Sequence, residues 1–175
     1  IQDIHIYLIN LESSQSLSPK GLLDLNNILL CAMDLKKYFN KDYINKEEFP
    51  ILEELFSNLY TNEGVTKTIS TSIIDENTID DRASAELQKI RKKIRTLEQD
   101  IRAKLNSMIH SSNFSKYIQE NVVTIRNDRF VIPIKEEYRS QVKGFVHDVS
   151  NAGSTLFIEP ISIFELNNEI NQLRL

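Results

Sequence analysis

Glycine is scarce in this chain, and its scarcity excludes several kinds of site. The 175 residues include 4 glycines, whereas globular proteins average roughly 7%. Loops that cradle phosphate groups need glycine because it lacks a Cβ. Neither of the glycine-rich nucleotide motifs, G-x-x-x-x-G-K-[ST] and G-x-G-x-x-G, occurs in the sequence. The sequence therefore favours a helix-rich protein. We also expect no cofactor to bind within these 175 residues.

Cysteine and long apolar runs are also lacking. The single cysteine, Cys31, excludes an internal disulfide and a Cys-rich metal site, so we expect a reducing, cytoplasmic compartment. The longest apolar run, 28–33, has six residues, and about 18 are needed to cross a bilayer. We therefore expect no membrane partner. The chain begins without Met and stops at Leu175 inside an apolar repeat, which indicates a piece of a longer protein.

Charge is unevenly distributed along the chain. The net charge is −4, but residues 1–81 carry −8 and residues 82–115 carry +5. Such asymmetry occurs where an acidic scaffold carries a nucleic-acid-facing arm. A solvated helix face is, however, the commoner explanation for a basic segment such as residues 82–115.

Two helices are predicted in the first half. Ser18 and Pro19 form a helix start, because a hydroxyl caps the first turn and proline needs no donor there. Apolar residues then recur at spacings of three and four, predicting a helix over 19–39. Pro50 opens a shorter helix that ends at 62–64, and the two should pack together. Residues 65–81, rich in Thr, Ser and Asp, predict an extended linker with some strand character and a turn at 75–77.

The second half predicts a long helix and then a small sheet. From Leu87 to Met108, apolar residues form a heptad-like seam without glycine or proline. A short helix near 114–118 follows, and the period then changes from 3.6 to 2. Two strand pairs are expected, with turns at 127–128 and 150–153. Because Pro133 cannot donate to a neighbour, it predicts an edge strand or a strand end. From Ile163 a helical seam resumes, so the strands interrupt two helices.

Catalytic chemistry has little support in these residues. The three histidines are far apart in sequence and have no second ligand at helical spacing. His147, Asp148 and Ser154 supply the residue types of a hydrolase triad. Adjacent strand residues point to opposite faces, however, so Asp148 cannot easily orient His147. We expect a structural or hydrogen-bonding role for this group, no catalytic residue and no metal site.

Basic residues are concentrated in the predicted sheet, with aromatic residues among them. Cations neutralise phosphates and aromatic rings stack on bases. From composition alone, a solvated surface with a core of aromatic side chains is the better interpretation. A second basic stripe, Lys89 to Arg95, winds around the long helix and suits a soluble helix surface. The candidate nucleic-acid-binding residues are Arg126, Arg129, Lys135, Arg139 and Lys143.

Two sets of motifs resemble one protein family. Residues 81–91 resemble the D-x-A-S-x-x-L-x-x-I-R entry into the lever helix of MutS-type proteins. The second set is more specific, and with the first it identifies the MutS-two branch, bacterial paralogues of the mismatch-repair ATPase that lack its mismatch-reading domain. The resemblance covers essentially the whole chain. In one departure, the turns at 75–77 and 127–128 contain no glycine. The second set comprises Val123-Thr124-Ile125-Arg126, Arg129 to Lys135, Glu137-Tyr138-Arg139, Gly144, His147-Asp148, Ser150, Gly153-Ser154-Thr155, Phe157 to Pro160 and Glu165-Leu166-Asn167-Asn168.

The resemblance implies a fold and a division of the chain. The implied fold class is mainly α with a small antiparallel β insertion (α+β), with a helical core, long lever helices and a β-rich clamp at their tip. Residues 1–81 would be the core with its extended linker. Residues 82–121 would be the lever and a short helix, 122–160 the clamp, and 161–175 the start of the return lever helix.

The resemblance also implies a function. This part would be noncatalytic and would grip branched or mismatched DNA, or ribosomal RNA on collided ribosomes. ATP and Mg²⁺ would bind an ATPase domain elsewhere, a Smr-type nuclease domain would follow it, and the full-length protein would be a homodimer. Two alternative functions remain possible. The apolar seams of the two predicted helices favour a helical dimerisation or protein-docking module, and the other alternative is a hydrolase built around His147.

Overall fold

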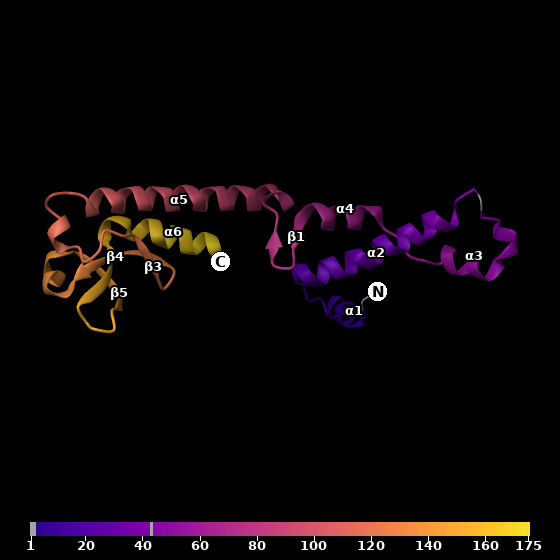
Figure 1. Ribbon diagram of the computed structural model, residues 1–175, viewed down its shortest axis with the longest axis horizontal. Coiled ribbons are helices and arrows are strands. Elements are labelled where there is room, and N and C mark those ends of the chain that lie inside the picture. Colours follow the sequence, from indigo (N-terminus) through magenta and orange to yellow (C-terminus); the bar gives the residue numbers. More distant parts are fainter. Residues whose placement is uncertain (1–2, 43) are drawn as a thin grey trace. The chain divides into compact units, whose positions relative to one another are not determined.

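The chain forms two compact units. The computed structural model describes residues 3–42 and 44–175 (Figure 1). One unit runs to Gln88 and the other from Lys89 to Leu175. The chain is mainly helical with antiparallel strands, so the predicted fold class is confirmed.

The first unit is built on a long helix, α2, that matches its prediction. It spans Pro19–Phe39, and the Ser18 hydroxyl accepts from the Gly21 N–H at 3.2 Å. The ring of Phe39 stacks on Phe56 of α3 with centroids 4.6 Å apart, so these two helices pack together as predicted. The elements of this unit are α1 (His5–Glu12), α2, η1 (Lys46–Glu48), α3 (Pro50–Ser57), α4 (Glu63–Ser72), β1 (Ile73–Asp75), β2 (Thr78–Ile79) and η2 (Asp81–Ala83).

One prediction for this unit is wrong, because residues 63–72 form the helix α4 rather than extended chain. Asn62 begins this helix instead of ending the previous one, since its side-chain oxygen accepts from the Val65 N–H at 3.0 Å. Thr66 and Ile69 are buried, and α4 contacts α2. Packing of this face outweighs the low helix propensity of Thr and Ser.

The expected turn at 75–77 is present between β1 and β2. The Asn77 N–H donates to the Asp75 carboxylate at 2.9 Å, and this bond holds the pKa of Asp75 below its ordinary value. A side-chain oxygen thus satisfies the turn backbone where glycine is absent.

The second unit contains a four-stranded antiparallel sheet between two helices in sequence. The strand order is β3-β4-β6-β5. Both turn residues of the β3–β4 hairpin, Asn127 and Asp128, have positive φ (50° and 59°), as a type I′ turn requires. The elements are α5 (Ala85–Ile109), η3 (Ser115–Tyr117), β3 (Thr124–Arg126), β4 (Arg129–Lys135), η4 (Glu136–Gln141), β5 (Gly144–Val149), β6 (Thr155–Pro160), η5 (Ile161–Ile163) and α6 (Phe164–Arg174).

The sequence predicts an edge strand or a strand end at Pro133: β4 is not an edge strand, but Pro133 lies near its end, where β3 no longer pairs with it. Pairing of β3 with β4 ends at Val131. Pro133 lies beyond that point, so its missing N–H costs β3 no hydrogen bond. Its carbonyl still accepts from the Gln119 N–H at 2.9 Å.

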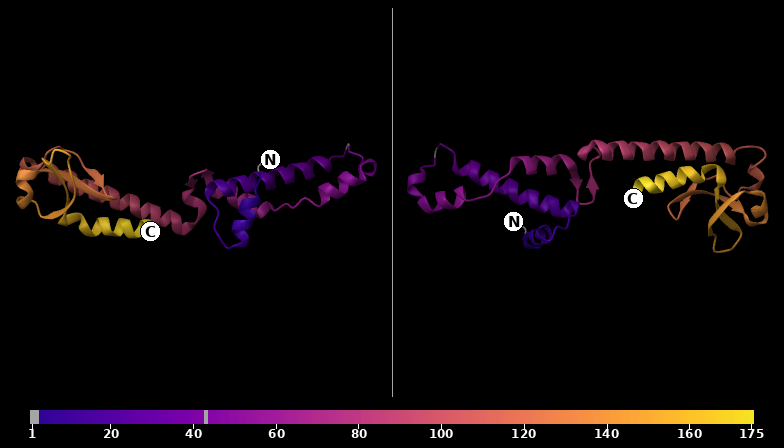
Figure 2. Two further views of the ribbon diagram at one scale, coloured as in Figure 1. Left: turned by 90° about the horizontal axis from the view of Figure 1, so that it is seen from below. Right: turned by 180° about the vertical axis from the view of Figure 1, so that it is seen from behind.

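The core of the second unit lies between α5 and the sheet. The predicted seam is confirmed where Leu97, Ile101 and Leu105 are buried, and strand residues such as Ile132 and Ile158 belong to the same cluster. Helix α6 lies alongside α5 (Figure 2). Ion pairs from Lys93 to Glu169 and from Arg174 to Glu98 join the two helices.

Candidate nucleic-acid interface

Arg126 and Arg129 face each other across the β3–β4 hairpin but have different surroundings. The Arg126 Nε donates to the Asp148 carboxylate at 3.0 Å, and its guanidinium lies 4.2 Å from the centroid of the Phe157 ring. Its side chain keeps 37% of its surface exposed. Arg126 is therefore held in place at the surface and still reachable from solvent.

Arg129 points inward. Its guanidinium donates to Glu159 Oε1 at 2.7 Å and to the side-chain oxygen of Asn168. Glu159 has no exposed surface, and the Arg129 side chain is 19% exposed. The charge of Arg129 is thus used to neutralise a buried carboxylate.

The other three predicted cations lie elsewhere on the second unit. Lys135 is at the opposite end of β4 from Arg129, six strand residues away and so about 20 Å. Arg139, in η4, donates to the carbonyls of Val142 and Gly144 at 3.1 and 3.3 Å. Lys143 is exposed just before β5. The five residues therefore surround the sheet and do not form a single cluster.

The second unit also contains a buried polar cluster around Glu159. Oε1 of Glu159 accepts from Arg129 and, at 2.7 Å, from the amide of Asn167. Oε2 lies 2.6 Å from Nε2 of His147. Asn167 also bonds to both the N–H and the C=O of Phe130, at 3.1 and 3.2 Å. We call Arg129, His147, Glu159, Asn167 and Asn168 the Glu159 cluster.

The sequence does not predict the Glu159 cluster, because its members lie up to 39 residues apart and belong to four elements. Each member does occur in the motifs quoted above for the family resemblance. A carboxylate at the end of an apolar strand, with two consecutive asparagines eight residues later, was the available signal.

The hydrolase alternative has no geometric support. His147 bonds to Glu159, whereas Asp148 pairs with Arg126. The predicted hydrogen-bonding role of this group is therefore confirmed for both residues. Within residues 3–42 and 44–175, no group of three His, Cys, Asp or Glu side chains could hold a metal ion.

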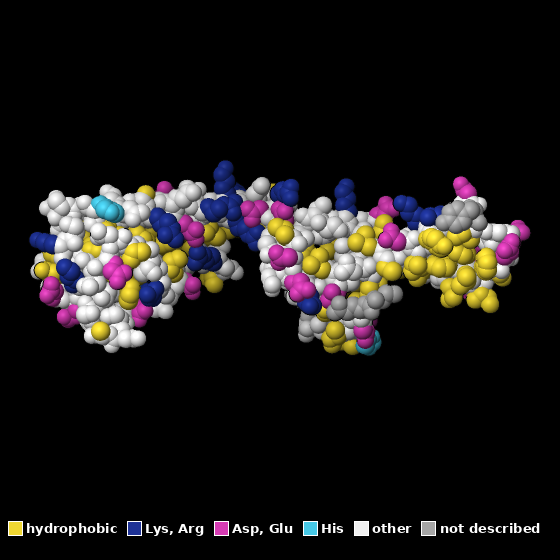
Figure 3. Space-filling model, viewed as in Figure 1, with side chains coloured by type: hydrophobic (Ala, Val, Ile, Leu, Met, Phe, Trp, Pro, Cys, Tyr) yellow, Lys and Arg dark blue, Asp and Glu magenta, His cyan; other side chains and the backbone are white. Residues whose placement is uncertain are grey.

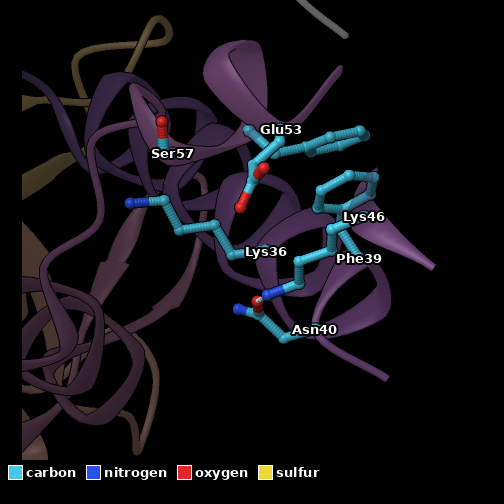
Figure 4. Close-up of a pocket in the computed structure, with 7 residues that line it drawn as sticks. Lys36, Phe39, Asn40, Lys46, Glu53 and Ser57 are labelled. Carbon is cyan, nitrogen blue, oxygen red and sulfur yellow. Dashed lines mark hydrogen bonds between the residues drawn. The ribbon is translucent and has the colours of Figure 1, made fainter. Parts of the chain in front are cut away.

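A small pocket in the first unit lies between α2, η1 and α3 (Figure 4). Its volume is about 260 Å³. Lys46 already donates to the side-chain oxygen of Asn40 at 2.5 Å. Glu53 places a carboxylate beside the Lys36 and Lys46 side chains, which disfavours an anionic ligand. We assign no site to this pocket.

The two units differ in the kind of surface they expose. In the second unit, Lys and Arg side chains are interspersed with Asp and Glu (Figure 3). In the first unit, hydrophobic side chains gather around α3 (Figure 3). Ile51 is 74% exposed and Leu55 60% exposed. The first unit therefore exposes an apolar patch around α3.

Comparison with known proteins places the whole chain in one family. The chain is 42% identical over all 175 residues to an endonuclease MutS2 of Acetivibrio thermocellus, and spans 22% of that protein. It is 43% identical to the endonuclease MutS2 of Ruminiclostridium cellulolyticum, with 99% of the chain and 22% of the relative covered. A third endonuclease MutS2, from Clostridioides difficile, is 43% identical over 91% of the chain and 20% of the relative.

No protein-family model matched the chain. Among the described residues, no helix is both long and apolar enough to cross a membrane.

The full-length similarity to several MutS2 proteins agrees with the motif resemblance from Asp81 to Asn168. The chain is therefore a MutS2-family sequence, and it spans about 22% of the length of its relatives.

Proposed function

We propose that this chain is a noncatalytic, nucleic-acid-gripping part of a MutS2-type protein. The observation that carries the proposal is the match over the whole chain to proteins named endonucleases, which act on nucleic acid. In this proposal the first unit is the helical core, α5 and α6 are lever helices, and the sheet is the clamp.

The grip is formed by the cations that remain at the surface of the sheet. Arg126, Arg139 and Lys143 keep their charged groups at or near solvent, and Lys135 adds a fourth at the far end of β4. Arg129 supports them indirectly, because its charge is used by Glu159. Arg126 and Arg139 are also held by hydrogen bonds, which reduces the entropy lost when they bind a phosphate. The ligand is branched DNA or ribosomal RNA, since both present closely spaced phosphates.

The rest of the activity belongs, in this proposal, to other parts of a cytoplasmic homodimer. ATP and Mg²⁺ bind an ATPase domain outside these residues, and a separate nuclease domain cleaves the nucleic acid. Both glycine-rich phosphate motifs are absent from this sequence, which supports an ATP-binding site outside these residues.

The proposal predicts salt-dependent binding by the 175-residue chain. A fluorescently labelled four-way DNA junction should bind at low salt, and the affinity should fall steeply as salt rises. Three or four phosphate contacts give a slope of log K against log[salt] near −3, because each contact releases counterions. Fluorescence anisotropy between about 50 and 200 mM KCl measures it, with a structured RNA hairpin of equal length as second ligand. Absence of binding to both ligands at 50 mM KCl would overturn the proposal.

One observation favours the docking-module alternative, namely the exposed apolar side chains around α3. Large apolar patches commonly mark protein interaction sites. If the chain self-associates in sedimentation experiments at 500 mM KCl and binds neither nucleic acid, this second function is the better one. Apolar burial does not weaken with salt, whereas phosphate binding does, so salt dependence distinguishes the two functions.

A further inference from the structure

Helix α6 is joined to the sheet by a short connection. Strand β6 ends at Pro160, and α6 begins at Phe164 after the three residues of η5. A single turn of this kind can absorb changes in φ and ψ, as hinge segments do. The direction in which α6 leaves the sheet must therefore be set by contacts farther along the helix.

Apolar packing alone defines that direction poorly. The buried residues Ile163 and Ile170 and the half-buried Leu166 and Leu173 form the α6 seam. Hydrophobic burial is non-directional, so small rotations of the helix about its first turn cost little burial. The Lys93–Glu169 and Arg174–Glu98 pairs are partly exposed, and exposed ion pairs contribute about 0–1 kcal/mol.

The Glu159 cluster supplies directional contacts one turn into α6. Asn167 is 1% exposed and makes three hydrogen bonds, two to the backbone of Phe130 in β4 and one to Glu159 in β6. Asn168 accepts from Arg129 of β4, and Glu159 also contacts His147 of β5. Each bond is buried or part-buried and needs a defined angle. Any tilt of α6 would leave buried donors and acceptors unpaired, which is costly.

We propose that the Glu159 cluster is a lock that holds α6 at one angle to the sheet, so that the helix and strands β4, β5 and β6 move as one body. Without the lock, α6 pivots about η5 while the sheet keeps its fold. The proposal does not depend on nucleic-acid binding. It assigns Glu159 and Asn167 the role of positioning residues for α6.

The test is a distance measurement within the 175-residue chain. Spin labels are placed on the exposed residues Asn151, in the β5–β6 turn, and Gln172, on α6, in a Cys31→Ser background. Double electron–electron resonance should give a narrow distance distribution for this parent. Asn167→Leu, which keeps the branched shape and the number of side-chain heavy atoms and removes all three hydrogen bonds, should broaden the distribution at least twofold with unchanged circular dichroism.

The matched control is Asn171→Leu, the same change one helical turn later and outside the cluster. It should leave the distribution as narrow as in the parent. Equal widths for Asn167→Leu and the parent would overturn the proposal, as would equal broadening by the control. If Asn167→Leu does not fold, Asn168→Ala replaces it, because it removes the Arg129 bond alone. That variant should broaden the distribution by a smaller factor, and a parent-like width would again overturn the lock.

Discussion

Replacing Gly144 with alanine is expected to destabilise the second unit by about 3 kcal/mol or more. A Cβ at this position would lie 2.2 Å from the carbonyl oxygen of Glu159 and 2.9 Å from its carbonyl carbon. Those atoms belong to the backbone of β6, which cannot move without breaking its pairing with β4. Overpacking usually costs about 1–3 kcal/mol, and a clash with backbone lies at the upper end.

Gly64→Ala is the matched control for this substitution. Gly64 lies in α4, and its nearest neighbour to a new Cβ is a side-chain oxygen at 3.4 Å. Alanine is the better helix former, so this variant should be neutral or more stable by up to about 1 kcal/mol. Hydrogen exchange of the β5 and β6 amides measures the stability of the second unit separately from that of the first. Parent-like exchange rates in Gly144→Ala would show that the strands do not approach as closely as described.

Removal of the Glu159 carboxylate is expected to have a comparable effect. Glu159→Ala leaves the guanidinium of Arg129 and the amide of Asn167 without their acceptor in a buried site. Breaking a buried ion pair on one side costs about 3–5 kcal/mol, because the remaining charge stays desolvated. The urea concentration at which the second unit unfolds should fall accordingly.

The control for this variant is Glu137→Ala. Glu137 is exposed in η4, and substitutions of exposed charges change stability by less than about 0.5 kcal/mol. A loss below about 1 kcal/mol in Glu159→Ala would contradict the assignment of Glu159 as the acceptor that holds the cluster together.

The predictions that succeeded rest on local signals. The cap at Ser18 and the apolar spacing to Phe39 define α2, and both are contiguous in sequence. The turn at Asn127 and Asp128 was predictable because these residue types tolerate positive φ. Periodicity and turn chemistry act over a few residues, so the sequence is enough to identify them.

The predictions that failed depend on tertiary contacts. Helix α4 is rich in threonine and serine, and the sequence does not reveal that α2 packs on Thr66 and Ile69. Alternation along β6 places Glu159 on the opposite face from the buried Ile158, and no sequence pattern indicates that other side chains cover this face. That cover comes from Asn167 of α6 and His147 of β5, which only the folded chain brings together. For the same reason, Arg129 was indistinguishable in sequence from the surface cations.

Nucleic-acid binding by the sheet can be tested with two matched sets of charge-removing variants. The first set changes Arg126, Lys135, Arg139 and Lys143 to glutamine, and leaves Arg129 intact so that the Glu159 cluster persists. The second set changes Lys89, Arg91, Lys92 and Arg95 of α5 to glutamine. Both sets remove four positive charges, so a general electrostatic effect would weaken binding equally.

Binding of the labelled four-way junction is measured by anisotropy at about 100 mM KCl. The sheet set should lose at least tenfold in affinity, and its salt slope should shrink by about 0.9 for each phosphate contact removed. The helix set should bind within threefold of the parent. Parent-like binding by the sheet set, with binding abolished in the helix set, would contradict the account and place the grip on α5.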